Sequence, residues 1–265
     1  MHEKRRQNTT KINPSHLTKL LKHIEMISKN EIKYIQSLSH KKTRDEEEVF
    51  IAEGIKLVNE LLNSNIVIKK IYALQEWVKI HPHLNNVTIV TEDQLKKISS
   101  QQTSNKVLAI VEKKKIKTGP QLKGNITLVL DGIQDPGNLG TIIRIADWFG
   151  IHQIVAAGDT ADIYNPKVVQ STMGSIIRVD VWYKELATFL QQAEVEIYGA
   201  LLQGENIYTH SKIAEGIIVI GNESQGIRNN LLPLLKHVIT IPKKGEAESL
   251  NAAVATGIIL SHIVK

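Results

Sequence analysis

The stretch Asp131-Gly-Ile-Gln-Asp-Pro-Gly-Asn-Leu-Gly-Thr-Ile-Ile-Arg144 follows the apolar segment Thr127–Leu130 and leads into a helical pattern. A buried strand that ends in a polar turn before a helix is typical of an α/β protein with a parallel sheet. Asn138 is placed to cap the helix that we expect over Leu139–Phe149. The free N–H groups of that helix start favour phosphate. Arg144, one to two turns further on, would project near the same end.

The alternation of strands and helices continues on both sides of this stretch and to the last residues. The apolar, mostly uninterrupted strands favour a buried parallel sheet. Further strands are expected at Gln153–Ala156, Glu196–Leu202, Ile217–Ile220 and Val238–Ile241. Further helices are expected at Pro166–Ser171, Lys184–Gln192 and Ser249–Ile263.

Two more segments place polar side chains directly after expected strands. In Ile217–Gly226 (IIVIGNESQG) the strand runs into a turn that carries one acid, Glu223. In Ile241–Ala255 (IPKKGEAESLNAAVA) a polar loop precedes a helix start with Ser249 and Asn251. Ligands in α/β proteins bind outside the carboxyl ends of the strands. Each segment also has a purely structural interpretation, as an ordinary turn with a solvated Glu223 or as a Ser249 cap.

The preceding residues form a separate pattern of short strands and helices. Residues 1–27 are an N-terminal extension, with helical spacing only from His16 to Ile27. Residues 28–112 are expected to form a small α/β domain, and residues 113–121 (KKKIKTGPQ) a linker to a domain over residues 122–265. The small domain should contain strands at Phe50–Ile51, Ile66–Leu74, Asn86–Val90 and Val107–Val111, an Asn30-capped helix through Leu38, a helix over Gly54–Leu62 and a Thr91-capped helix.

The net charge of +6 is unevenly distributed along the chain. Up to Gln121 there are 22 Lys and Arg against 13 Asp and Glu, a balance of +9, and from Leu122 there are 11 against 14, a balance of −3. A basic first half would suit a polyanion such as nucleic acid, although lysine-rich surfaces also simply aid solubility.

Several classes of protein are disfavoured by what the sequence lacks. It has no cysteine, which excludes disulfides and thiolate metal sites and fits a cytoplasmic protein. No apolar run reaches the roughly 18 residues of a membrane span, and the polar start does not look like a signal peptide. No HxxxH or HExxH spacing predicts a metal site, and no G-x-G-x-x-G or G-x-x-x-x-G-K-[ST] motif predicts a dehydrogenase or NTPase.

Three segments together resemble the signature motifs of the SpoU (TrmH-like) RNA 2′-O-ribose methyltransferases of the SPOUT superfamily. QDPGNLGTIIRIADWFG resembles the first motif, GNESQG the second and IPKKGEAESLNAAVA the third, and Lys167–Ser175 also resembles family sequence. The likeness covers residues 122–265. Lys41–Arg44 and Phe50–Gly54 resemble, more weakly, a ribosomal-protein-like RNA-binding domain. One departure is Ser224, where the family usually has Gly, so this position must avoid positive φ or bear strain.

The resemblance implies a SPOUT domain with a parallel sheet and a deep trefoil knot, binding S-adenosyl-L-methionine, and a homodimer that completes each active site. It nominates Arg144, Asn138, Glu223, Ser249 and Asn251 as catalytic residues. Since free Arg stays protonated, we expect Arg144 to hold phosphate and stabilise a developing alkoxide rather than act as a base. The implied donor contacts are Gly221, Ile241 and Leu250, with Leu201 and Pro242 as weaker candidates.

The resemblance implies an RNA ribose 2′-hydroxyl as the substrate, with ribosomal RNA favoured over transfer RNA because the two-domain layout resembles that of the ribosomal-RNA enzymes. Lys41, Lys42 and Arg44 are candidate phosphate contacts, or else a solvated charged loop, because Asp45–Glu48 follow directly. Two alternatives remain, a non-catalytic RNA-binding protein and a SPOUT enzyme that methylates a base nitrogen. Neither metal nor membrane is expected as a partner.

Overall fold

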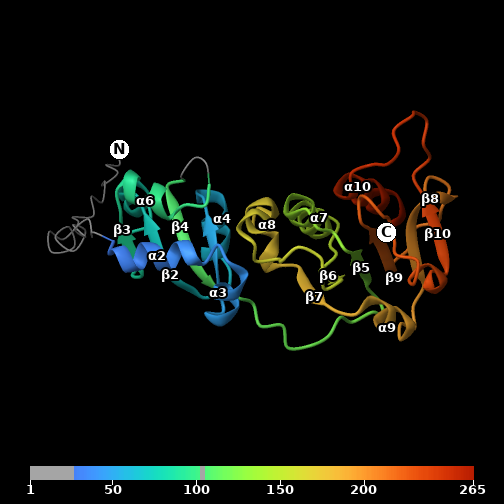
Figure 1. Cartoon of the computed structure of the whole chain (residues 1–265), viewed down its shortest axis with the longest axis horizontal. Coiled ribbons are helices and arrows are strands. Elements are labelled where there is room, and N and C mark those ends of the chain that lie inside the picture. The colour runs from blue at the N-terminus through green and yellow to red at the C-terminus, as the bar shows by residue number, and fades with distance from the viewer. Residues whose placement is uncertain (1–26, 102–104) are drawn as a thin grey trace, which may run out of the picture.

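The protein has two β-sheets joined by an extended segment in a computed structural model that describes residues 27–101 and 105–265 (Figure 1). The helix expected from His16 to Ile27 therefore lies almost wholly outside the described residues. The first sheet has four strands in the order β1-β4-β2-β3, with β4 antiparallel to both neighbours and β2 parallel to β3. Its strands are β1 (Val49–Glu53), β2 (Ile68–Ala73), β3 (Val87–Ile89) and β4 (Val107–Glu112).

Helices cover both faces of this first sheet because successive strand residues point to opposite sides. Phe50 packs with the apolar side of α4, whereas its neighbour Val49 packs with that of α2. The helix expected after an Asn30 cap begins earlier, because the Ser28 side chain accepts a hydrogen bond from the Glu31 N–H. The helices here are α2 (Lys29–Ser37), α3 (Lys41–Glu46), α4 (Ile55–Leu62), α5 (Gln75–Lys79) and α6 (Glu92–Ile98).

The second sheet has six strands, all parallel, in the order β10-β8-β9-β5-β6-β7. This confirms the predicted parallel sheet. The edge strand β7 was not predicted, because its sequence, DVWY, is short and mixes polar with apolar residues. The strands are β5 (Ile126–Asp131), β6 (Gln153–Ala156), β7 (Asp180–Tyr183), β8 (Ile197–Asn206), β9 (Gly216–Gly221) and β10 (His237–Thr240).

The second sheet is the middle of three layers (Figure 1). Leu128 and Leu130 of β5 pack toward α7, α8 and α10, and the intervening Val129 packs toward α9. The expected helix from Ser249 begins only at Ala252, since Asn251 is its cap. The helices are α7 (Pro136–Trp148), α8 (Pro166–Thr172), α9 (Leu186–Gln191) and α10 (Ala252–Ile263).

Strands β5 and β9 mark the point at which the strand order reverses. They pair in register from Ile126↔Gly216 to Asp131↔Gly221, so both end at the same level. From β5 the chain proceeds outward to β6 and β7, whereas β9, β8 and β10 lie on the other side. Such a switch point leaves a crevice at the carboxyl ends of the strands, where α/β proteins bind ligands.

The two sheets share a packed seam. Helix α8 packs against β1, and the rings of Phe50 and Tyr164 lie 5.0 Å apart. Buried apolar residues of both sheets form one continuous cluster across the seam. Burial raises the pKa of Tyr164 to about 12, so its hydroxyl stays neutral and accepts the Lys114 N–H at 3.0 Å. This hydrogen bond joins the segment after β4 to the loop before α8, on the side of the second sheet.

Candidate active site at the carboxyl ends of the parallel strands

Three loops bring together one polar side chain from each of the three sequence motifs. The Asn138 side-chain amide donates to Glu223 Oε1 at 2.5 Å, and Asn251 Nδ2 donates to Asn138 Oδ1 at 2.9 Å. These residues follow β5, β9 and β10 respectively. Because both ends of the Asn138 amide are used, its orientation is fixed. We call Asn138, Glu223 and Asn251 the polar triad.

The start of α7 holds Asn138 in the first helical turn and not at the cap. Asp135 is the cap, since its carboxylate accepts the Asn138 N–H at 2.8 Å, and Pro136 takes the first helical position. The predicted Asn138 cap is therefore wrong, and its side chain is free for the triad. The Asn138 N–H is the main cause that lowers the pKa of Asp135, with Lys167 adding to it.

Asn251 has two tasks at the start of α10. Its Oδ1 accepts the Ala253 and Val254 N–H groups at 3.0 and 3.3 Å, while its Nδ2 reaches Asn138. Ser249 precedes the helix in an exposed loop, so it is not a cap. Within the part of the chain that the structure describes, its hydroxyl has no hydrogen-bond partner, and it stays a prediction as a site residue.

The loop after β9 is a tight turn that needs glycine at Gly221. A Cβ there would lie 2.2 Å from the Gly226 carbonyl carbon, closer than atoms can pack. Asn222 pairs with Gly226 through backbone hydrogen bonds, and its Nδ2 donates to Gly132 O at 2.6 Å. Ser224 does not have a positive φ, so the departure from glycine causes no backbone strain. The turn that carries Glu223 is thus tied to the loop after β5.

An ion pair between the buried Asp131 and the partly exposed Arg228 was not predicted from the sequence. Asp131, fully buried at the end of β5, accepts the Arg228 N–H at 2.7 Å and lies 3.2 Å from Arg228 Nε. Arg228 also pairs with Asp159 at 2.5 Å. Burial raises the pKa of Asp131 against the opposing effect of Arg228, which in turn lowers the pKa of Asp159. Asp131 closing an apolar strand was the available signal, but its partner lies 97 positions away.

Arg144 lies apart from the triad within one chain. It comes six positions after Asn138 in α7, about 9 Å along the helix axis and about 240° around it. Its side chain faces a groove of about 720 Å³ between α7 and α4. No side-chain hydrogen bond or ion pair joins the Arg144 guanidinium to any residue of 27–101 or 105–265. The structure thus brings three of the five predicted catalytic residues into contact, and leaves Arg144 and Ser249 outside that contact.

The residues predicted to hold the methyl donor come to the same edge of the sheet. Leu201 lies on β8, Gly221 ends β9, and Ile241 and Pro242 follow β10, and these three strands are neighbours. All four residues are half-buried, whereas Leu250 is 46% exposed. Half-buried apolar walls and an uncovered leucine fit the adenine and thioether parts of S-adenosylmethionine, and the close backbone at Gly221 leaves main-chain groups to bind its polar edges.

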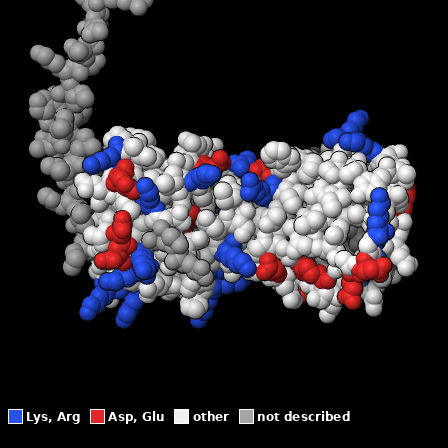
Figure 2. All heavy atoms as spheres, turned by 90° about the horizontal axis from the view of Figure 1, so that it is seen from above, with Lys and Arg blue, Asp and Glu red and all other residues white. Residues whose placement is uncertain are grey.

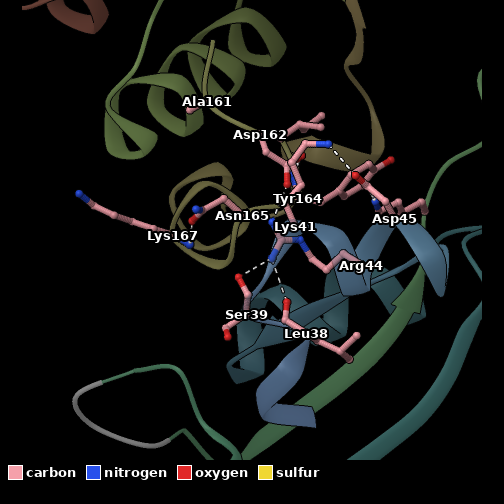
Figure 3. A network of polar contacts seen from close by, with 12 residues as sticks. Leu38, Ser39, Lys41, Arg44, Asp45, Ala161, Asp162, Tyr164, Asn165 and Lys167 are labelled. Atoms are coloured by element: carbon pink, nitrogen blue, oxygen red, sulfur yellow. Dashed lines mark hydrogen bonds and ion pairs between the residues drawn. The ribbon is translucent and has the colours of Figure 1, made fainter. Parts of the chain in front are cut away.

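Arg44 does not face solvent as a phosphate contact would, and that prediction is corrected. It is 1% exposed, and it donates to the carbonyl oxygens of Leu38 and Ser39 and to Asp162 Oδ2 at 2.6 Å (Figure 3). The guanidinium is therefore paired within the seam between the two sheets and is not available to a phosphate. Lys41 and Lys42 remain exposed, each paired along α3, with Asp45 and Glu46.

The described residues contain neither a candidate membrane span nor a cluster of metal-ligating side chains. No helix in that part of the chain has the length and apolar character to cross a bilayer. Nor do three or more of its His, Asp and Glu side chains gather where they could hold a metal ion.

The sequence and the fold both match known proteins. The family model "SpoU rRNA Methylase family" matches residues 125–261, and "MRM3-like substrate binding domain" matches residues 29–109. The 23S rRNA (guanosine(2553)-2′-O)-methyltransferase RlmP of Bacillus subtilis (strain 168) is 31% identical over 92% of this chain and 99% of its own.

Two solved structures cover nearly the whole molecule. A TrmH-family structure from Porphyromonas gingivalis has a TM-score of 0.79 at 33% identity, over 91% of this chain and 99% of that one. The AdoMet-bound rRNA methyltransferase from Sinorhizobium meliloti has a TM-score of 0.78 at 32% identity, over 89% and 95%. With the polar triad formed by the three motifs, these matches show that the chain belongs to the SpoU rRNA methylase family.

Proposed function

We propose that this protein is an S-adenosylmethionine-dependent methyltransferase that modifies a ribose 2′-hydroxyl in ribosomal RNA. The observation that carries the proposal is the polar triad, in which Asn138 joins Glu223 and Asn251 at the switch point of the sheet. The Bacillus relative is named as a 23S rRNA 2′-O-methyltransferase, which favours ribose over base and ribosomal over transfer RNA.

S-adenosylmethionine, when bound, supplies an electrophilic methyl group for an in-line displacement. Gly221, Ile241 and Leu250 would hold it, with Leu201 and Pro242 as further apolar contacts. Glu223 and Asn251, joined through Asn138, would orient the ribose, since a positioned hydroxyl reacts far faster than a free one. Ser249, exposed beside Leu250, would line the acceptor side.

Arg144 would serve as an electrostatic group. Its guanidinium can hold an RNA phosphate with two hydrogen bonds and stabilise the alkoxide that develops as the 2′-hydroxyl loses its proton. In one chain, however, Arg144 points away from the triad toward α4. We therefore propose a homodimer in which Arg144 of one copy completes the triad of the other.

The surface over α7 and α10 supports such a dimer. Seen from above, this half of the molecule shows a broad uncharged area, bordered by a row of Asp and Glu (Figure 2). Val254, on the outer side of α10, is 50% exposed. An uncharged area with an exposed apolar side chain suits the core of a protein interface, where charged residues are depleted, and two-fold symmetry would present the same face from each copy.

The remaining features of the proposal concern topology and substrate choice. The last residues pair with Ile213, through Ile213 N–H to Ile263 O at 2.7 Å and Lys265 N–H to Ile213 O at 3.0 Å, which supports the knot that we infer for the C-terminal segment. Residues 28–112 would select the RNA, with exposed Lys41 and Lys42 as phosphate contacts. The enzyme would act in the cytoplasm.

Transfer of labelled methyl groups tests the function directly. The purified protein is incubated with labelled S-adenosylmethionine and unmodified 23S ribosomal RNA, which is then digested to nucleosides. We expect the label on a ribose 2′-oxygen. Label on a base would favour the base-methylating alternative, and no label, together with no affinity for S-adenosylmethionine, would favour the non-catalytic one.

A further inference from the structure

The groove between α4 and α7 is built from both halves of the molecule. Its volume is about 720 Å³. Its lining includes Lys56 and Glu60 from α4, Arg144 and Trp148 from α7, and Met173 and Arg178 from the segment that follows α8. It lies beside Arg144 and not beside the polar triad. Whatever occupies it would therefore run past the residue to which we assign charge stabilisation.

The two walls of the groove are held at a fixed spacing. Arg178 donates to Glu60 on α4 at 2.8 Å and to Asp147 on α7 at 2.9 Å. Asp147 also accepts the Ser175 hydroxyl at 2.7 Å. Since this ion-pair network links the N-terminal sheet's helix to α7, the groove is a preformed feature.

Trp148 stands in this groove with 85% of its surface exposed, the highest fraction of any large apolar residue among those described. It lies one helical turn beyond Arg144 on the same face of α7. Met173 lines the groove as well, 37% exposed and held at a φ of +51°. Strained non-glycine residues often occur at ligand sites, and an exposed indole offers a flat surface for a nucleobase.

Two cations in the groove are not neutralised. Arg178, Glu60 and Asp147 satisfy one another. Lys56 and Arg144, in contrast, form no ion pair and no side-chain hydrogen bond with any of the residues that the structure describes. A flat aromatic surface flanked by free cations is the combination that single-stranded RNA sites use.

We infer that this groove binds the single-stranded RNA next to the methylated nucleotide, with one base stacked on Trp148 and a phosphate held by Lys56. The inference rests on the proposed function and names the path of its substrate. A second copy of the chain is the other occupant to consider. The cores of protein interfaces are depleted of charged side chains, whereas this groove is lined mainly by charged and amide groups, so the observations favour RNA.

Binding can be measured apart from catalysis through the Trp148 indole. A base stacked on an indole quenches its fluorescence. Of the other two tryptophans, Trp77 is buried, 1% exposed, and Trp182 is half-buried with its indole N–H donated to Thr118 O at 3.0 Å. We expect a short single-stranded oligoribonucleotide to quench the emission of the full-length protein, and Trp148→Phe to lose most of that quenching while it still binds RNA. Quenching that is unchanged in Trp148→Phe would place the RNA elsewhere.

Measured RNA affinity distinguishes the contribution of the Trp148 indole from that of the Lys56 ammonium. Trp148→Ala should raise the Kd for 23S ribosomal RNA about tenfold, and Trp148→Phe much less, since a benzene ring still stacks. Lys56→Gln should lower the slope of log Kd against log salt by about 0.7, the value for one phosphate on a single strand. Lys212→Gln, which removes an exposed lysine between β8 and β9 and outside residues 28–112, is the matched control and should leave the slope unchanged.

The outcomes distinguish this inference from the proposed function. Wild-type RNA affinity in Trp148→Ala would overturn the inference alone. Dissociation of Trp148→Ala into monomers on sedimentation would also overturn it, because the groove would then be covered by a second copy. If the wild-type protein binds and is quenched by RNA but transfers no methyl group to ribose, the proposed function fails and the groove stands.

Discussion

Arg144 carries a positive charge that no protein group neutralises within the described parts of the chain. A guanidinium in this position can hold a phosphate through two parallel hydrogen bonds, which a lysine ammonium cannot do. The loss of one preorganised donor from a transition state commonly costs a factor of about 100 in kcat.

We therefore expect Arg144→Lys to lower the kcat for RNA methylation by about 100-fold. The affinity for S-adenosylmethionine, measured by calorimetry, should be unchanged, because the proposed donor contacts lie on other loops. Wild-type kcat in this variant would show that a point charge suffices and that the two-bond role is wrong.

Arg228 stabilises the buried carboxylate of Asp131 at the end of β5. Its backbone N–H and its Nε both reach Asp131, which is fully buried. We expect Arg228→Ala to lower the free energy of unfolding by about 2 kcal/mol at neutral pH, because it leaves the buried carboxylate of Asp131 without its cation. Urea denaturation measures it. Asp159→Asn removes only an exposed partner and should cost less than about 1 kcal/mol.

The deficit of Arg228→Ala should depend on pH with a defined sign. Burial raises the pKa of Asp131 above its unfolded value, so the folded state favours the protonated acid. Without Arg228 the pKa rises further. The deficit is then largest at neutral pH, shrinks as the pH falls through the folded pKa, and is smallest near the unfolded pKa of about 3.9. A deficit that is constant with pH would exclude Asp131 as its source.

At the scale of elements, the start of α7 positions Asn138 and depends on the Asp135 cap. Asp135→Ala should cost about 1 kcal/mol of unfolding free energy, the usual loss for a removed cap, and should also lower methylation by letting the first turn fray. Asp135→Asn keeps an oxygen for the Asn138 N–H and should restore most of both.

The same cap has its own pH dependence. The pKa of Asp135 is lowered by the Asn138 N–H, so the carboxylate contributes fully above the unfolded pKa of about 3.9 and loses that contribution as the pH falls through its lower folded value. Asp135→Asn should lack this loss in acid denaturation curves. An identical acid transition in both proteins would contradict the assignment.

The elements themselves were largely readable from the sequence, whereas their side-chain partners were not. Apolar runs predicted β5, β6 and β9 because buried parallel strands are continuous in hydrophobicity. The Asp135-Pro136 pair, a cap followed by proline, was the better start signal than Asn138. Arg44 looked exposed among its charged neighbours, but its burial depends on Asp162, 118 positions away. Contacts at such distances leave no local pattern.

At the scale of the whole molecule, the separation of Arg144 from the triad predicts an active site shared between two copies. A purified heterodimer of one Arg144→Ala chain and one Glu223→Ala chain would have one site with both defects and one intact. We expect it to methylate RNA at about half the wild-type rate per dimer, while each mutant homodimer is nearly inactive.

Differently tagged chains, co-expressed and purified through both tags, make this measurement possible. An inactive heterodimer would mean that each chain supplies its own Arg144. A heterodimer that cannot form, with all chains monomeric in sedimentation, would remove the proposed dimer itself.

The shared seam limits how this protein can be shortened. Tyr164 packs on Phe50, α8 packs on β1, and Asp162 pairs with Arg44. A fragment that began at Leu122 would leave this apolar flank open to water, and uncovered patches of that kind promote aggregation. The catalytic half is thus a poor candidate for transplantation onto a foreign RNA-targeting module, unless the graft also rebuilds an aromatic and a cation at the positions of Phe50 and Arg44.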